Sequence, residues 1–428
     1  MKSKVTAFFI ALVLVSAIPV WSGGQQEVDI DEGVTLEVLN YGDMGTPEGQ
    51  SWLELVDQFE ADYPDIRVDH DSLYDEVYHS RATAQLAAGD VPDLMYVWPT
   101  PRSSYAYDAE VLVDLRDYLD LSAYSDAAMA PQGPDGEIYT IPISIGMNSV
   151  MYANTQLLDE LGMSVPETYD ELTAMVEPLR DEGLIPITMG NADTWVMNST
   201  LFGTLVGRFG GPGWFQAAVD GEVSFTDDEF VTALEWLERI YDDGVLPEDS
   251  IQTDYGTALS QFNNERAPFL IDGHWRAEGW AEAPFAEDVE WMVFPALDGE
   301  SYSGSTAGGG APGYTITTAA TENDERLEAA ITMLEYITQE PGASIRVETQ
   351  PGFIPSYEGV SLDDVDFVTQ QKSVFYDSVS QVLDTPDAFL PPDTNDVLNN
   401  GMQELALGVV TPQELAERVQ EQFEQEED

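Results

Sequence analysis

The sequence predicts a protein of the α/β class that is built from more than one domain. Strand-like and helix-like segments alternate along residues 34–98, and such alternation implies a mainly parallel sheet covered by helices. The chain has 428 residues, which is enough for two or three domains with a core each. Hydrophobic residues make up 43% of it and include nine tryptophans, a composition typical of packed lobes and not of disorder.

The first elements follow from their local signals. Thr46 and Pro47 predict a helix N-cap with proline at the first helical position, and Tyr63-Pro64 predicts the end of that helix. Alternating or continuous apolar residues predict strands, and the next helix ends at Gly89. The expected strands are 34–39, 66–69 and 94–98, and the expected second helix is 75–88.

Similar signals continue along the rest of the chain. Capping-box patterns at Thr168/Glu171, Thr226/Glu229 and Thr411/Glu414 each open an amphipathic run. We expect strands at 289–294 and 314–317 and a helix at 325–337. Trp52, Trp236 and Tyr336 lie on apolar helical stripes, so we expect them in the core. The Gly- and Ser-rich loop 301–313 is either a flexible linker or a loop whose backbone approaches a ligand closely.

The N-terminus has the pattern of a secretory signal peptide. Lys2 and Lys4 precede an apolar run over residues 5–21. A membrane anchor is the alternative, but the run is short for a span of about 20 residues and contains Pro19. We therefore expect a leader at residues 1–22 and a flexible acidic tether at 23–33, and an exported, soluble protein.

The absence of cysteine narrows the chemistry. The chain has no cysteine, so disulfides, lipoprotein acylation, cysteine-ligated zinc and thiol catalysis are all excluded. The exported protein is therefore expected to be periplasmic or extracytoplasmic without a lipid anchor of that kind.

The charge is strongly one-sided. Asp and Glu number 80 against 15 Lys and Arg, and Lys372 is the only lysine beyond the leader. Acids occur along the whole chain, which favours adaptation to concentrated salt, where screening shortens repulsion between carboxylates. The alternative is a surface that binds cations or repels nucleic acids. Nucleic acid is excluded as a partner, because phosphate contacts need Lys and Arg.

Several motifs occur in a recognisable order. Residues 135–142 read DGEIYTIP, 151–154 read MYAN, and 166–172 read PETYDEL. Other segments are FEADYPDIRV at 59–68, AAGDVPDL at 87–94, NNERAPFLIDGHW at 263–275 and GFIP at 352–355. Together they resemble a family 1 extracellular solute-binding protein, the sugar-capturing component of an ABC importer, similar to maltose-type binding proteins. Asn264 stands where that family usually has glycine, and Pro268 precedes the strand; both departures concern a turn.

The resemblance implies a two-lobed periplasmic-binding-protein fold (Venus-flytrap, type II) with a hinge of three chain crossings, near 144–150, 293–297 and 350–355. It implies an N-terminal lobe from residues 34–145 and 296–350 and a C-terminal lobe from residues 146–295 and 351–428. It also implies that a solute binds between the lobes and stabilises their closure. A membrane permease of the ABC transporter would then recognise the closed, monomeric protein.

Candidate ligand contacts follow from sugar chemistry and from the resemblance. Sugars need aromatic platforms and convergent polar groups, and α/β proteins bind ligands at the carboxyl ends of strands. Trp98 ends a strand, and Trp275 matches the family's stacking tryptophan. Arg102 is either a ligand contact or a partner of local acids. The predicted ligand-binding residues are Tyr41, Asp43, Trp98, Arg102, Asn148, Trp195, Asp272, His274, Trp275, Gly309, Gly310 and Phe353.

Two other functions stay open. A secreted glycan-acting enzyme is one, although paired carboxylates mean little among 80 acids. The chain lacks the G-x-S-x-G, H-E-x-x-H and P-loop motifs, and His70, His79 and His274 lack the spacing of metal ligands. We therefore predict no catalytic residue, metal or cofactor. The other alternative is a binding protein for a non-sugar organic solute.

Overall fold

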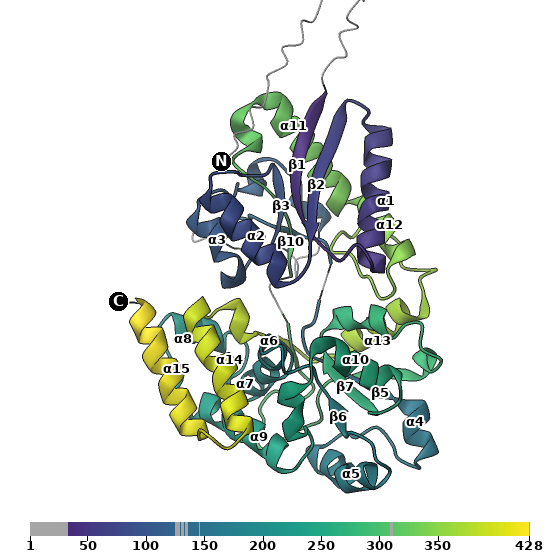
Figure 1. Ribbon diagram of the computed structural model, residues 1–428, viewed down its shortest axis with the longest axis vertical. Helices are drawn as coiled ribbons and strands as arrows, with labels where there is room; N and C mark the ends of the chain where they lie inside the picture. The colour runs from purple at the N-terminus through teal and green to yellow at the C-terminus, as the bar shows by residue number, and fades with distance from the viewer. Residues whose placement is uncertain are drawn as a thin grey trace, which may run out of the picture.

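The computed structural model describes residues 33–124, 129, 132, 136–144, 146–308 and 311–427. The expectations for the leader, for nearly all of the tether and for Gly309 and Gly310 lie outside these residues. The described chain forms two α/β bodies, one above the other in Figure 1, which confirms the expected fold class. None of the helices in the described ranges combines the length and apolar character that a membrane span requires.

The upper body, here called the N-terminal lobe, is built on a five-stranded sheet. Its order is β2-β1-β3-β10-β4, with β1 parallel to β2 and β3, and β10 antiparallel to β3 and β4. The strands are β1 (Val34–Tyr41), β2 (Ile66–Leu73), β3 (Leu94–Val97), β4 (Ile141–Pro142) and β10 (Gly313–Ile316). Its helices are α1 (Pro47–Asp62), α2 (Glu76–Ala87), α3 (Ser104–Asp108), α11 (Asp324–Thr338) and α12 (Glu340–Thr349). The parallel strands β1, β2 and β3 all end at the edge that faces the lower body (Figure 1).

Helix α1 shows how the predicted signals act. The Thr46 hydroxyl accepts a hydrogen bond from the Gly49 N–H, and Pro47 opens the helix. The buried positions, at helical spacing, are Trp52, Leu55, Val56 and Phe59. The helix ends at Asp62, immediately before Tyr63-Pro64, as expected. Trp52, Trp236 and Tyr336 are 3%, 8% and 6% exposed, which confirms that they are core residues.

The lower body, here called the C-terminal lobe, is built on a four-stranded sheet. Its order is β6-β7-β5-β8, with β5 antiparallel to β7 and β8, and β6 parallel to β7. The strands are β5 (Val150–Asn154), β6 (Ile187–Thr188), β7 (Phe269–Asp272) and β8 (Val289–Met292), with a separate pair β9 (Thr306–Ala307) and β11 (Val382–Leu383). Its helices are α4 (Thr155–Glu160), α5 (Tyr169–Asp181), α6 (Trp195–Met197), α7 (Gly203–Gly210), α8 (Trp214–Val219), α9 (Asp228–Asp242), α10 (Tyr255–Asn263), α13 (Phe367–Ser378), α14 (Pro392–Ala406) and α15 (Pro412–Glu427).

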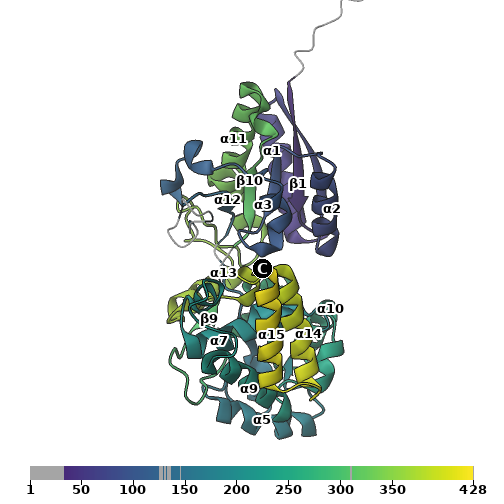
Figure 2. The same ribbon diagram turned by 90° about the vertical axis from the view of Figure 1, so that its left-hand side faces the viewer.

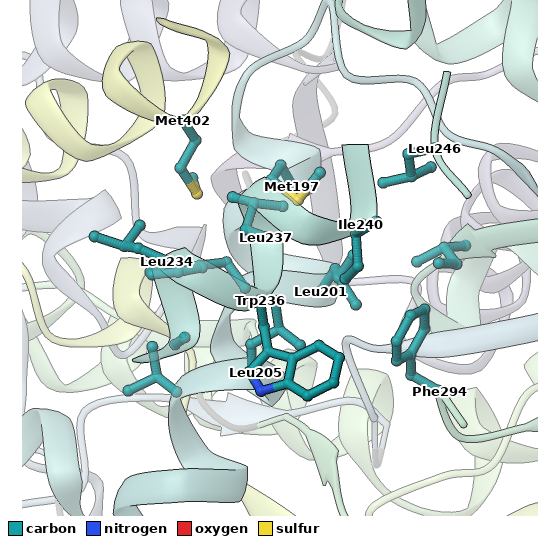
Figure 3. Packing of buried hydrophobic residues seen from close by; sticks show 14 of the residues in the cluster. Met197, Leu201, Leu205, Leu234, Trp236, Leu237, Ile240, Leu246, Phe294 and Met402 are labelled. Atoms are coloured by element: carbon teal, nitrogen blue, oxygen red, sulfur yellow. The ribbon is translucent and has the colours of Figure 1, made fainter. Parts of the chain in front are cut away.

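The core of the C-terminal lobe is centred on α9. Its buried side chains recur every three or four residues, from Phe230 to Ile240, as an amphipathic helix requires. Figure 3 shows Leu234, Trp236 and Leu237 of α9 together with Met197, Leu205 and Met402. Helices α14 and α15 lie side by side on the outside of this lobe (Figure 2), where Arg418 pairs with Glu404 at 2.5 Å. The acidic C-terminal segment continues α15 to residue 427.

Three chain segments connect the lobes. The first runs from β4 to β5. Near the second, the Ser301 N–H donates to the Arg208 carbonyl at 2.9 Å and the Ala307 N–H donates to the Thr204 hydroxyl at 2.9 Å. We therefore propose that residues 296–308 belong with the C-terminal lobe, and that the second crossing lies at 308–313 in place of 293–297. The third crossing passes through Gly352, whose N–H donates to the Thr369 hydroxyl at 3.0 Å.

Candidate functional site

A cleft of about 590 Å³ lies between the two lobes. Parallel strands direct the N-terminal lobe's side of it, since Tyr41, Tyr74 and Trp98 lie at or just beyond the ends of β1, β2 and β3. The C-terminal lobe contributes residues that follow β6 and β7 and that precede the antiparallel strand β5. The hinge segments close the remaining side with Ser144, Pro312 and Gln350. The directions of the strands in the two sheets therefore bring the segments that carry these residues to the same cleft.

Aromatic rings form the wall of the N-terminal lobe. The Tyr41 ring lies 4.9 Å from the Trp98 ring, nearly perpendicular to it, and 5.6 Å from the stacked Tyr96 ring. Trp98 is half-buried and lines the cleft, as do Tyr41 and Tyr74. Burial raises the pKa of the Tyr41 phenol well above its ordinary value, so the group is a neutral hydroxyl at working pH. This wall offers flat apolar surface with hydroxyl groups at its edges.

Arg102 lines the cleft and also pairs with a local acid. Its guanidinium lies 5.4 Å from the centre of the Trp98 ring and lines the cleft. It also pairs with Glu76 at 3.4 Å and donates to His79 Nε2 at 3.0 Å. Burial and the neighbouring Arg102 lower the pKa of His79 to about 3, so that imidazole is neutral and can accept this bond. Arg102 is therefore a partly neutralised cation that stiffens the aromatic wall.

A second aromatic group faces the cleft from the C-terminal lobe. The Trp275 indole N–H donates to the Tyr255 hydroxyl at 2.6 Å. The Trp195 ring lies 5.3 Å from the Tyr255 ring and 6.3 Å from the Trp275 ring. All three residues line the cleft, and Trp275 is 38% exposed. The two lobes thus present aromatic surfaces to one cavity.

Asp272, a predicted ligand contact, does not line the cleft. It is fully buried behind the C-terminal aromatic group, where Oδ1 accepts from the Tyr255 hydroxyl at 3.0 Å and from the Gly273 N–H at 2.7 Å. Its Oδ2 pairs with Arg276 at 3.2 Å. Burial raises the pKa of Asp272 to about 6, although Arg276 opposes the shift. The sequence located Asp272 beside Trp275 but could not show that the last residue of β7 points away from the cavity.

The other predicted residues have mixed positions. Asn148, Trp195, His274 and Phe353 line the cleft, and the Asn148 side chain has no hydrogen-bond partner within the described part of the chain. Asp43 also lines it, but its Oδ1 is engaged by the Gly45 N–H at 2.8 Å. Gly309 and Gly310 lie outside the described residues. Their described neighbours Gly308 and Ala311 lie at the hinge and in the cleft wall, respectively.

Several cleft residues were not predicted. Tyr74 follows β2, which runs four residues beyond the expected strand 66–69, so the strand-end signal that selected Trp98 did not select it. Tyr255 opens a helix without any distinguishing pattern. Glu48 and Glu278 are half-buried and come from opposite lobes, and within the described residues their carboxyl groups have no hydrogen bond or ion pair. Burial raises the pKa of Glu48 to about 7 and, with the charge of Glu48, that of Glu278 to about 8. The described residues hold no group of three or more metal-ligating side chains.

The sequence matches a protein-family model over most of its length. The model is described as bacterial extracellular solute-binding protein, and it matches residues 45–344. This range includes most of the cleft residues of both lobes.

Individual relatives are distant but extend along the chain. The Multiple sugar-binding protein of Streptococcus mutans is 22% identical over 298 residues, which is 67% of each chain. The Melibiose/raffinose/stachyose-binding protein of Bacillus subtilis is 21% identical over 430 residues, covering 97% of this chain and 95% of the relative. A solved structure from work on xylan utilization by Caldanaerobius polysaccharolyticus has a TM-score of 0.80 at 21% identity, covering 91% of this chain and 100% of that one. A maltodextrin-binding domain of Bdellovibrio bacteriovorus, bound to maltotriose, has a TM-score of 0.71 at 20% identity, covering 92% and 99%.

Proposed function

The chain belongs to the bacterial extracellular solute-binding protein family, and we propose that it captures a neutral mono- or oligosaccharide between its lobes and delivers it to the permease of an ABC importer. The protein acts outside the cytoplasm, as a monomer, and returns its ligand chemically unchanged. It is a binding protein and not an enzyme.

The observation that carries this proposal is the pair of aromatic walls. Trp98 and Tyr41 on one lobe, and Trp195 and Trp275 on the other, line the same cleft. Pyranose rings have flat C–H faces that pack on such rings, and their hydroxyls need polar groups around the edge. Asn148 and the carboxylates of Glu48 and Glu278 are unpartnered within the described residues and supply such groups. The names of the sugar-binding relatives in Streptococcus mutans and Bacillus subtilis point to the same class of ligand.

Anionic ligands fit the cleft poorly. Three cations line it, and each has an internal partner: Arg102 pairs with Glu76, Arg276 with Asp272, and Lys372 donates to His274. A bound carboxylate or phosphate would also lie beside Glu48 and Glu278, where its charge would repel either group whenever that group is ionised. A neutral ligand avoids this repulsion.

A cationic organic solute is the second candidate. It is favoured by Glu48 and Glu278, two unpaired carboxyls that approach the cleft from opposite lobes. Aromatic rings can also bind a quaternary or primary ammonium through cation–π contacts. The same two carboxyls can also accept hydrogen bonds from sugar hydroxyls, so they do not distinguish the two candidates. The aromatic surfaces on both lobes therefore favour carbohydrate.

Calorimetry against a mixed panel tests the proposal. The panel contains maltotriose, stachyose, chitotriose, galactose, spermidine, glycine betaine, a tripeptide and Ca²⁺, all in molar NaCl. We expect one saturable site per chain for at least one sugar, a raised melting temperature with that sugar, and recovery of the intact sugar by mass spectrometry. Heat from spermidine or betaine alone would replace the proposal with the cationic candidate. Cleavage of a bound sugar would show an enzyme.

A further inference from the structure

Lys372 is an unusual lysine in this chain. It is the only one beyond Lys4, and it is 2% exposed on α13. Its ammonium lies 2.7 Å from His274 Nδ1 and donates to the Gly352 carbonyl at 2.8 Å. It therefore joins α13, the third crossing and His274, a residue of the cleft.

The contact determines which nitrogen of His274 carries a proton. A lysine ammonium has three donors and no acceptor, so the Nδ1 atom facing it must accept. In a neutral imidazole the proton is then on Nε2. Within the described residues His274 Nε2 has no hydrogen-bond partner, and His274 lines the cleft. Among the described residues, the Nε2–H group is thus a donor without an acceptor.

Gly146 sets the position of this donor. A Cβ added at Gly146 would lie 2.3 Å from His274 Nε2 and 2.8 Å from Cδ2, so any larger residue would displace the ring. Gly146 is part of the first crossing and also lines the cleft. Two of the three crossings therefore hold the imidazole. The first does so through Gly146, and the third does so through the Gly352 carbonyl, which accepts from Lys372.

The charges around this pair keep the imidazole neutral. Burial and the nearby Lys372 lower the pKa of His274 well below its usual value. Burial lowers the pKa of Lys372 to about 7, while Glu278 and Asp366 oppose that shift. The charge of Glu48, across the cleft, raises the pKa of Glu278. The Tyr376 ring lies 5.5 Å from the Lys372 ammonium. The lysine is therefore charged below about pH 7, which is where it fixes the tautomer most firmly.

We propose that Lys372 is a positioning residue that, together with Gly146, holds His274 as a neutral imidazole whose Nε2–H donates to an acceptor oxygen of the bound ligand. This inference rests on the proposed function, because it assigns a specificity contact within the same cleft. Ligands with a hydroxyl or ring oxygen at this point satisfy the donor, and deoxygenated analogues leave it unpaired.

The tautomer can be measured without any ligand. The chain has three histidines, so ¹⁵N-histidine labelling and a long-range ¹H–¹⁵N spectrum give three ring systems, with His274→Asn assigning the third. At pH 6 we expect a protonated Nε2 and a bare Nδ1 for His274. In Lys372→Met the ring should show mixed tautomers or titrate at a higher pH than in wild type, and Lys372→Arg should restore the wild-type pattern. A wild-type ring protonated on Nδ1, or an unchanged ring in a folded Lys372→Met protein, would overturn the inference.

Binding supplies the second readout. With the panel sugar that binds most tightly among maltotriose, stachyose and chitotriose, Gly146→Ala should weaken affinity at least tenfold. Gly256→Ala is the matched control, because its Cβ would meet only an Asp254 oxygen, at 3.5 Å. Equal affinities for the two glycine variants would contradict the ring-positioning role. If no panel compound bound, the proposed function would fail while the tautomer result would still stand.

Discussion

Trp275 combines an exposed ring with a fixed orientation. Its indole N–H is bonded to Tyr255, and 38% of the residue is accessible. Trp275→Ala should therefore weaken sugar binding by about 1–3 kcal/mol, the scale of one lost stacking platform, and change stability little. Calorimetry at constant salt measures this. Tyr302→Ala is the matched control, since Tyr302 is 37% exposed and lies outside the cleft lining. Unchanged affinity in Trp275→Ala would remove it from the site.

Single residues of the site were predictable where strand ends located them. Trp98 follows β3, where the strand-end rule placed it, and Trp275, which the resemblance selected, follows β7. Both line the cleft, and their contact with a ligand stays a prediction. Asp272 shows the limit, because one residue along a strand reverses the side to which it points. Tyr255 and Lys372 reach the cleft only through tertiary packing, for which no local pattern exists.

Helices α5 and α9 are both amphipathic but differ in their N-terminal caps. Thr168 and Glu171 form a complete capping box at α5, with the Glu171 N–H donating to the Thr168 hydroxyl at 3.3 Å. Thr168→Ala should cost about 1 kcal/mol of unfolding free energy. Thr226→Ala, at the start of α9, should cost clearly less. Urea unfolding of both variants measures the difference, and equal losses would contradict the assigned caps.

The predicted capping boxes had different outcomes for a physical reason. Those at Thr168/Glu171 and Thr411/Glu414 are confirmed by reciprocal bonds. The one at Thr226/Glu229 is wrong, because α9 starts one residue later, with Asp227 as N-cap. Asp227 instead accepts from the Ser224 N–H at 2.9 Å, and this turn directs the chain into the helix. A Ser-Phe-Thr-Asp segment offers several caps, and tertiary packing selects among them.

Across the whole molecule, the acidic surface should make stability depend on salt. Two of the 15 basic residues lie in the expected leader, residues 1–22, and the remaining residues carry 13 against 80 acids. Screening reaches about 10 Å at 0.1 M salt and about 3 Å at 1 M, so repulsion between carboxylates falls steeply. The melting temperature should rise strongly between these conditions. Comparing NaCl with sulfate at matched ionic strength separates screening from strengthened apolar burial. A melting temperature that is equal in dilute buffer and in molar NaCl would refute adaptation to salt.

The raised pKa values of the cleft carboxyls predict that stability falls as pH rises. A carboxylate in an ordinary ion pair has a lowered pKa and gives the opposite dependence. The pKa of Glu278 is raised to about 8, so folding favours its protonated form. That stabilisation is complete below the pKa of the unfolded state and is lost as pH rises through about 8. Glu278→Gln, which stays neutral, should therefore gain melting temperature over wild type as pH increases from 5 to 8.5. Glu177→Gln, at a side chain 82% exposed, is the control. A constant offset across pH would contradict the raised pKa.

The two-lobed architecture was predictable as a whole, because motif order and strand–helix alternation both specify it. The position of the second crossing at 308–313 is a proposal, and the Gly- and Ser-rich loop gives no local signal of which lobe it joins. Arg208 supports this position, because its buried guanidinium donates to the Pro295 carbonyl at 2.9 Å and pairs with Glu300 at 3.1 Å. These bonds hold the segment after β8 against α7, in the C-terminal lobe.

A crystal structure with the panel sugar that binds best tests the central claim most directly. We predict a sugar ring in the cleft between the lobes, packed on Trp275 or Trp195 from one side and approached by Trp98 from the other. Small-angle scattering at saturation should show a smaller radius of gyration than without sugar, because ligand favours the closed form. Sugar bound elsewhere on the surface, with the cleft empty, would contradict the account.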